Sequence, residues 1–194
     1  RPRQALVEDP DCENLMILPS VRGYRKNEVS GQMLRAIINS LQGFDYTLID
    51  CPAGIELGFH RAVSAASEAL VVTTPHISAV KDAGKVIGIL GTYKIDARLI
   101  VNRVRGDMVL DGEMASPDDI RQALGIPLCG IIPENDEINA LSANGEKPKS
   151  GGNGSKAFSL LCHNIVYGTS DMYDYTAGYK GIFGGIKRAL KKHL

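Results

Sequence analysis

Short apolar runs alternate with stretches of helical periodicity along most of this 194-residue chain. The strand candidates are residues 15–18, 46–50, 69–74, 99–102 and 128–132. Each is apolar at most positions, as in strands that are buried on both faces of a sheet. Strands that alternate with helices predict a mostly parallel sheet with helices on both faces. The predicted fold class is therefore α/β.

Four stretches between or after these strands repeat apolar residues at the spacing of an amphipathic helix. They cover residues 33–41, 79–90, 116–124 and 158–165. The third begins with Ser116 and Pro117, residues typical of the N-cap and first turn of a helix. Asp118 and Asp119 then place negative charge at the positive end of the helix dipole. The sequence thus predicts where this helix begins.

Composition excludes several classes of function. The 22 basic residues balance 22 acidic ones, so the net charge of zero gives no general case for a polyanion partner. No apolar run reaches the roughly 18 residues of a membrane-spanning helix, and no signal-peptide pattern is present. The four cysteines (Cys12, Cys51, Cys129 and Cys162) are widely spaced, which favours reduced thiols in a cytosolic protein.

Polar and turn residues follow the predicted strands, in the segments 50–54, 73–75, 102–103 and 133–135. Ligands of parallel α/β sheets bind beyond the carboxyl ends of the strands, so these segments are expected at one edge. Asp50 stands where a Walker B strand holds Mg²⁺, and Gly54 leaves a backbone N–H that can approach a phosphate. Taken alone, Asp50 is better explained as a solvated strand-end aspartate.

The segment 143–154 is rich in Gly and Lys and superficially suggests a phosphate-binding loop. That loop requires G-x-x-x-x-G-K-[ST] directly after a buried strand. Here Ser155 separates Gly154 from Lys156, and no apolar strand precedes them. We therefore predict a surface loop. No G-x-G-x-x-G follows a strand either, so a dinucleotide oxidoreductase has no support.

The stretch from Phe44 to Leu90, with FDYTLIDCPAGIE and ALVVTTPHISAVKDAGKVIGIL, resembles the MinD family of deviant-Walker-A, ParA-like ATPases. The likeness continues through LIVNRVRGDMV, LGIPLCGIIPE and SANGEKP, and it covers nearly the whole chain in order. Within the superfamily, the D-x-P-A-G-I-E element is specific to this family. The resemblance implies a P-loop NTPase fold of the SIMIBI type, with ATP and Mg²⁺ as cofactors and ATP hydrolysis as the activity.

The resemblance also implies roles for single residues. Asp50 would lie near Mg²⁺ and Gly54 near the γ-phosphate, as metal-binding and catalytic positions. Asn102 would hydrogen-bond the adenine edge, which suits a side chain with both a donor and an acceptor. The other cofactor-binding positions are Arg103 against the base, Pro133 through its carbonyl and Asn135 near the sugar.

The family's first strand, its phosphate loop with two lysines and its switch I aspartate precede the region present here. We therefore expect an N-terminally incomplete member, with an ATPase domain over residues 1–167 that alone neither binds ATP tightly nor hydrolyses it. Asn135 and His76 stand where relatives commonly carry an acidic residue. Asp82 lies on the helix implicated in partner regulation, although a solvated helix charge explains it equally well.

Residues 168–178 are predicted to be a polar linker and residues 179–194 an amphipathic helix with one basic and one bulky apolar face. Such a helix is typical of the membrane interface, and a core-packing helix is the alternative. The predicted membrane contacts are Tyr179, Ile182, Phe183, Ile186, Lys187, Arg188, Leu190 and Lys191.

The resemblance implies a cytoplasmic ATPase, peripheral on the inner face of the cell membrane, that acts in division-site selection. An ATP-bound homodimer would bind anionic lipids, recruit MinC, the inhibitor of FtsZ assembly, and respond to MinE or a functional substitute. No nucleic acid partner is expected, because the cations concentrate on the tail. The alternatives are a related flagellar-number or chromosome-partitioning ATPase and a non-catalytic membrane adaptor; an iron–sulfur carrier fits the cysteine positions poorly.

Overall fold

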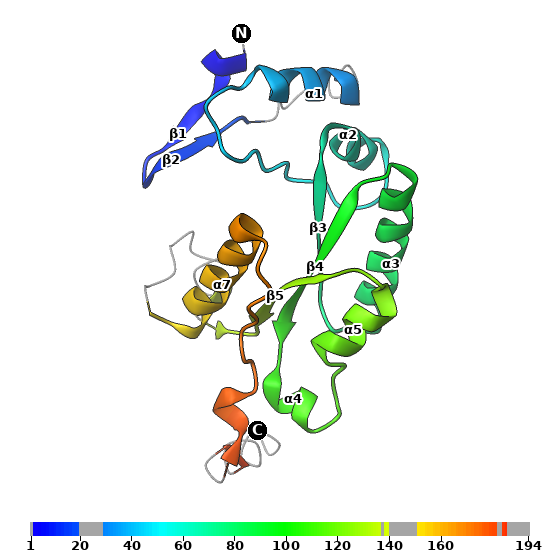
Figure 1. Cartoon of the computed structure of the whole chain (residues 1–194), viewed down its shortest axis with the longest axis vertical. Helices are drawn as coiled ribbons and strands as arrows, with labels where there is room; N and C mark the ends of the chain where they lie inside the picture. The colour runs from blue at the N-terminus through cyan, green and yellow to red at the C-terminus, as the bar shows by residue number, and fades with distance from the viewer. Residues whose placement is uncertain (1, 20–28, 137, 140–150, 182–183, 186–194) are drawn as a thin grey trace. The chain divides into compact units, whose positions relative to one another are not determined.

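The computed structural model describes residues 2–19, 29–136, 138–139, 151–181 and 184–185 (Figure 1). The chain folds into two compact units. The first contains Arg1–Glu68 and Tyr93–Ile95, and the second contains Ala69–Thr92 and Asp96–Leu194.

The first unit contains an antiparallel hairpin and a pair of packed helices. Its elements are a 3₁₀ turn (Pro2–Ala5), β1 (Val7–Asp9), β2 (Cys12–Ile17), α1 (Gly31–Ser40) and α2 (Leu57–Ala65). Val7 pairs with Ile17 across the hairpin, and the Asp11 N–H donates to Asp9 Oδ1 at 3.0 Å in the turn. The helix predicted over residues 33–41 is confirmed as α1.

Two strand predictions in this unit need correction. Residues 15–18 fall largely within β2, but β2 pairs with β1 in an antiparallel hairpin and is no part of the parallel sheet. Residues 46–50 form no strand, and Leu48 is 83% exposed. A strand depends on a neighbour for its backbone hydrogen bonds, and no described strand pairs with residues 46–50. Their apolar composition alone was therefore misleading.

The second unit contains a three-stranded sheet in the order β3-β4-β5, in which β4 and β5 run parallel. Its elements are β3 (Glu68–Thr73), α3 (Ile77–Thr92), β4 (Asp96–Val104), α4 (Gly106–Leu110), α5 (Pro117–Leu124), β5 (Leu128–Pro133), α7 (Asn153–Tyr167) and a 3₁₀ turn (Ala177–Tyr179). Three predicted strands and three predicted helices are confirmed here, and so is the α/β fold class.

Alternate residues of β4 enter two different apolar clusters. Leu99 and Val101 are fully buried with Ile120 of α5, and Val80 of α3 packs against them. Ile100 lies in the other cluster, which includes Ala157 and Leu161 of α7. In Figure 1, α3 and α5 lie on one side of the sheet and α7 on the other. Helices therefore cover both faces, as the continuous apolar strands predict.

The start of α5 follows its predicted capping signal. Ser116 Oγ accepts the Asp119 N–H at 3.1 Å, and the Ser116 N–H donates to Asp119 Oδ2 at 3.0 Å. These reciprocal bonds form a capping box, which gives two helix-end N–H groups a partner. Gly125 at φ 68° closes the helix in the left-handed region.

The capping box gives a prediction about the pKa of Asp119. The hydroxyl and backbone N–H of Ser116 hold that pKa below the ordinary aspartate value. A carboxylate with a lowered pKa stabilises the fold above the unfolded-state pKa, and this contribution is lost as the pH falls through the folded-state pKa. We expect Ser116→Ala to raise the pKa of Asp119 toward its ordinary value, measured by NMR titration of the side-chain carboxyl. Ser155→Ala on α7 is the control, and an unchanged Asp119 pKa in Ser116→Ala would contradict the assignment.

The segment 168–178, predicted to be a linker, packs against the rest of the second unit. Asn164 of α7 is 0% exposed, and its Nδ2 donates to the Cys129 carbonyl at 2.9 Å and to the Asp171 carbonyl at 2.8 Å. Its Oδ1 accepts the Thr169 hydroxyl at 2.7 Å and the Asp171 N–H at 3.0 Å. Met172 and Tyr175 pack against one apolar cluster and Tyr173 against the other. One buried amide therefore ties this segment to α7 and β5.

Candidate functional site

Four residues with implied roles at the nucleotide lie at the carboxyl edge of β4 and β5: Asn102, Arg103, Pro133 and Asn135. The register pairs Val101 with Ile131 and then Val104 with Pro133, so β4 contains one residue more than β5 in this interval. Such a bulge redirects the side chains around it. The bulge contains Asn102 and Arg103, which places the irregularity directly at the candidate site.

Arg103 has an uncommon backbone conformation at this bulge. Its φ is 60°, in the left-handed region that a residue with a Cβ enters at a cost. Asn102 Oδ1 accepts the Arg103 N–H at 2.9 Å, and the Val104 carbonyl accepts the Glu134 N–H at 3.0 Å. One hydrogen bond within β4 and one from the residue that follows β5 therefore hold the bulge in place.

The Arg103 side chain forms two hydrogen bonds with Glu134. Nε lies 2.8 Å from Oε2 and Nη2 lies 3.3 Å from Oε1. Asn139 Nδ2 donates to the same Oε1 at 2.7 Å. The bonds from Arg103 and Asn139 hold the pKa of Glu134 below its usual range, and Glu134 in turn raises the pKa of Arg103. The sequence analysis placed Glu134 in the strand-end segment 133–135 without giving it a role, and it did not single out Asn139.

Asp50 and Gly54 belong to the first unit, whereas the structure brings the four second-unit residues to one edge. Both are exposed in the segment before α2, and Gly54 has a φ of 84° with open space where a Cβ would stand. Desolvation of the sulfur and the nearby Asp50 carboxylate raise the pKa of the Cys51 thiol. Gly58, at the start of α2, has Pro52 directly against it, so the turn after Asp50 packs closely on the helix.

The exposed Asp50 carboxylate fits a magnesium ion. Mg²⁺ usually takes one or two protein carboxylates together with water and phosphate oxygens, so a single aspartate is sufficient. Among the described residues, no three His, Cys, Asp or Glu side chains gather into a metal cage. The donor set therefore suits a metal that arrives with a phosphate ligand better than a tightly held structural metal.

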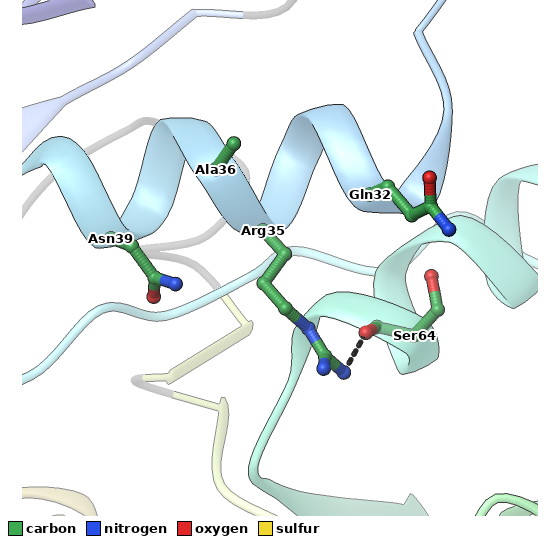
Figure 2. Close-up of a pocket in the computed structure, with 5 residues that line it drawn as sticks. All are labelled: Gln32, Arg35, Ala36, Asn39 and Ser64. Carbon is green, nitrogen blue, oxygen red and sulfur yellow. Dashed lines mark hydrogen bonds between the residues drawn. The ribbon is translucent and has the colours of Figure 1, made fainter.

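The α1 and α2 helices line a shallow hollow of about 410 Å³ (Figure 2). Arg35 Nη2 donates to the Ser64 carbonyl across it and joins the two helices. Gly31 allows this approach, because a Cβ there would stand 1.8 Å from Ser64 Oγ. The hollow is lined by Gln32, Arg35, Ala36, Asn39 and Ser64. None of these is a predicted site residue, so we assign the hollow to helix packing.

The predicted membrane segment is described only in part. Tyr179 ends the 3₁₀ turn Ala177–Tyr179, and Lys180 Nζ lies 3.6 Å from Asp174 Oδ2. Within the described ranges, no helix combines the length and hydropathy that crossing a bilayer would require. The remaining predicted contacts lie outside the described residues: Ile182, Phe183, Ile186, Lys187, Arg188, Leu190 and Lys191. Most of the predicted surface loop, residues 143–150, also lies outside them.

The parallel pair β4 and β5, with helices on both faces, places the protein in the class of α/β proteins, whose ligands bind beyond the carboxyl ends of the strands. Comparison with known proteins narrows this class. The septum site-determining protein MinD of Synechocystis is 43% identical over 145 residues, which are 74% of this chain and 54% of that protein. The MinD of Thermotoga maritima is 36% identical over 198 residues, covering 98% of this chain and 73% of that protein. The chain belongs to the MinD family of septum site-determining proteins.

Solved structures agree with this assignment. The MinC:MinD cell division protein complex of Aquifex aeolicus matches with a TM-score of 0.77 and 32% identity, covering 88% of this chain and 69% of that chain. MinD of Pyrococcus horikoshii complexed with Mg-ADP matches with a TM-score of 0.73 and 28% identity. The match covers 85% of this chain and 68% of that chain. No protein-family model matches the chain. The chain spans only 46 to 55% of the length of the first curated relatives it matches.

Proposed function

We propose that this chain is part of a MinD-type ATPase that acts in division-site selection. The observation that carries the proposal is the group of Asn102, Arg103, Pro133 and Asn135 at the carboxyl edge of β4 and β5. A relative of the same fold is complexed with Mg-ADP, which supports a nucleotide and Mg²⁺ as ligands. Membership of a family named for septum site determination supports the cellular role.

In this proposal, the second unit holds the nucleoside. The Asn102 amide offers a donor and an acceptor to the adenine edge, and the Pro133 carbonyl accepts from the base. The flat face of Arg103 lies against the ring, and Asn135 accepts or donates at the sugar. In the first unit, Asp50 would hold Mg²⁺ and Gly54 would offer its N–H to the γ-phosphate. Bound MgATP would supply the γ-phosphoryl group, and its transfer to water, with release of ADP and phosphate, would end the active state.

The proposal extends to the membrane and to protein partners. ATP promotes a homodimer, and two amphipathic tails then bind anionic lipid together, which raises avidity by roughly 10²–10⁴ over a single tail. MinC is the proposed partner because an Aquifex aeolicus relative is solved in complex with MinC. MinE or a functional substitute would stimulate hydrolysis and release the protein from the membrane.

Sedimentation with anionic vesicles tests this proposal. The natural protein that contains this chain is incubated with Mg²⁺ and either ATP or ADP, and a matched protein ends at Gly178. We expect the natural protein to sediment with vesicles in ATP and to stay largely in the supernatant in ADP. The truncated protein should stay in the supernatant with either nucleotide.

Vesicle binding that is equal in ATP and in ADP would contradict the ATP-dependent switch and favour a non-catalytic membrane adaptor. Binding to DNA that falls steeply with salt, with none to vesicles, would favour a partitioning ATPase. Neutral vesicles are the lipid control, because attraction of the basic tail requires anionic headgroups.

A further inference from the structure

We infer that Glu134, supported by Asn139, is the positioning residue that holds Arg103 at the nucleoside end of the site. This inference rests on the proposed nucleotide-binding function. Glu134 itself need not touch the nucleotide; it acts through the Arg103 guanidinium. None of the residue roles implied by the family resemblance includes it.

The geometry of the pair fixes the orientation of the guanidinium. Two bonds, at 2.8 Å and 3.3 Å, join the fork of Arg103 to the carboxylate of Glu134. A two-bond arginine–carboxylate pair restricts rotation of the guanidinium plane as well as its position. With a single bond, the long arginine side chain would sample several rotamers.

Glu134 is the better anchored partner of the two. Its side chain is 25% exposed, against 58% for Arg103. Asn139 donates to Oε1 at 2.7 Å, and the Glu134 N–H donates to the Val104 carbonyl at 3.0 Å. These contacts hold Glu134 independently of Arg103. The carboxylate therefore positions the guanidinium, and the reverse effect is smaller.

The pair also determines which part of a nucleotide suits this edge. Glu134 neutralises the charge of Arg103, so the pair attracts a phosphate less than a lone arginine would. A guanidinium held flat by its edge still presents its face to an aromatic ring. The pair therefore favours a purine base at this edge and disfavours a triphosphate, which orients the nucleotide.

The ion pair is too exposed to matter much for folding. Exposed ion pairs contribute little to stability, because water screens the attraction between the charges. We therefore expect Glu134→Gln to leave the thermal unfolding midpoint of the protein nearly unchanged. Its effect should appear in ligand binding, which separates a positioning role from a purely structural one.

The test uses the full natural protein, with Mg-ADP and tripolyphosphate as probes in calorimetric titrations. We expect Glu134→Gln to weaken Mg-ADP binding about tenfold, the scale of a lost hydrogen bond to a charged group. Tripolyphosphate, which has no base, should bind as well as before or better. Asp118→Asn is the matched control, because it removes an exposed 3.3 Å pair with Arg121 on α5. It should change neither affinity.

A double-mutant cycle identifies the route of the effect. On an Arg103→Ala background, Glu134→Gln should cause no further loss of Mg-ADP affinity, since its target is gone. Equal losses on both backgrounds, or no loss in the single variant, would overturn the inference while leaving the proposed function intact. Failure of the unmodified protein to bind Mg-ADP would refute the proposed function, and the inference with it.

Discussion

Replacing Asn164 with leucine should lower the free energy of unfolding by about 3 kcal/mol, near the upper end for single substitutions. The amide is completely buried and makes four hydrogen bonds, to Cys129, Thr169 and Asp171. Leucine has a similar volume but leaves the two carbonyls, the hydroxyl and the N–H without these partners. Urea unfolding followed by circular dichroism measures the loss.

Thr169→Ala is the matched control for this substitution. It removes the 2.7 Å bond from the hydroxyl to Asn164 Oδ1 and the 2.9 Å hydrogen bond between the hydroxyl and His163 Nδ1, and it keeps the other three bonds of the Asn164 amide; the residue is only half-buried. We expect a loss of about 1 kcal/mol. An Asn164→Leu protein as stable as the Thr169→Ala protein would show that the buried amide is not the main tie between α7 and the segment 168–178.

Gly106→Ala should destabilise the second unit by about 2–3 kcal/mol, because there is no room for a methyl group. A Cβ at Gly106 would stand 2.0 Å from the Tyr175 carbonyl oxygen and 2.9 Å from its carbon. These are backbone atoms, so the segment that carries Tyr175 must move. We expect faster amide hydrogen exchange in residues 168–179 and a lower urea midpoint.

Gly88→Ala on α3 is the control for this prediction. Gly88 is exposed within a helix and has open space where a Cβ would stand. Alanine favours helix over glycine, so this variant should be up to about 1 kcal/mol more stable than the parent. A Gly106→Ala protein that matched Gly88→Ala would contradict the close approach of Tyr175 to the start of α4.

Local signals were sufficient for much of the second unit. The strand predictions for residues 69–74, 99–102 and 128–132 correspond to β3, β4 and β5. The middle residues of β4 and β5 are buried by helices on both faces, so the segments 99–102 and 128–132 are mostly apolar, whereas Leu70 and Val72 of β3 are exposed. The Ser116 capping signal is equally local, since both partners lie within one helical turn.

Local signals failed where an element depends on a distant partner. Residues 46–50 have the composition of a buried strand but pair with no described strand, and β2 pairs in an antiparallel hairpin. The sequence analysis also missed α2 and α4. α2 has no side-chain cap at Glu56, and α4 spans only Gly106–Leu110, too short for a visible periodicity.

The sequence by itself determined the α/β class, the approximate positions of β3, β4 and β5 and, by resemblance, the family. It placed Asn102, Arg103, Pro133 and Asn135 at one edge because parallel strands end on the same side of their sheet. Only the tertiary structure showed that Glu134 and Asn139 hold Arg103, and that Asn164 ties residues 168–178 to the core. The contacts of Arg103 join two strands, and those of Asn164 join α7 to β5 and to the chain that turns back after α7. Tertiary packing decides which side chains meet in this way, and the spacing of residues in the sequence does not.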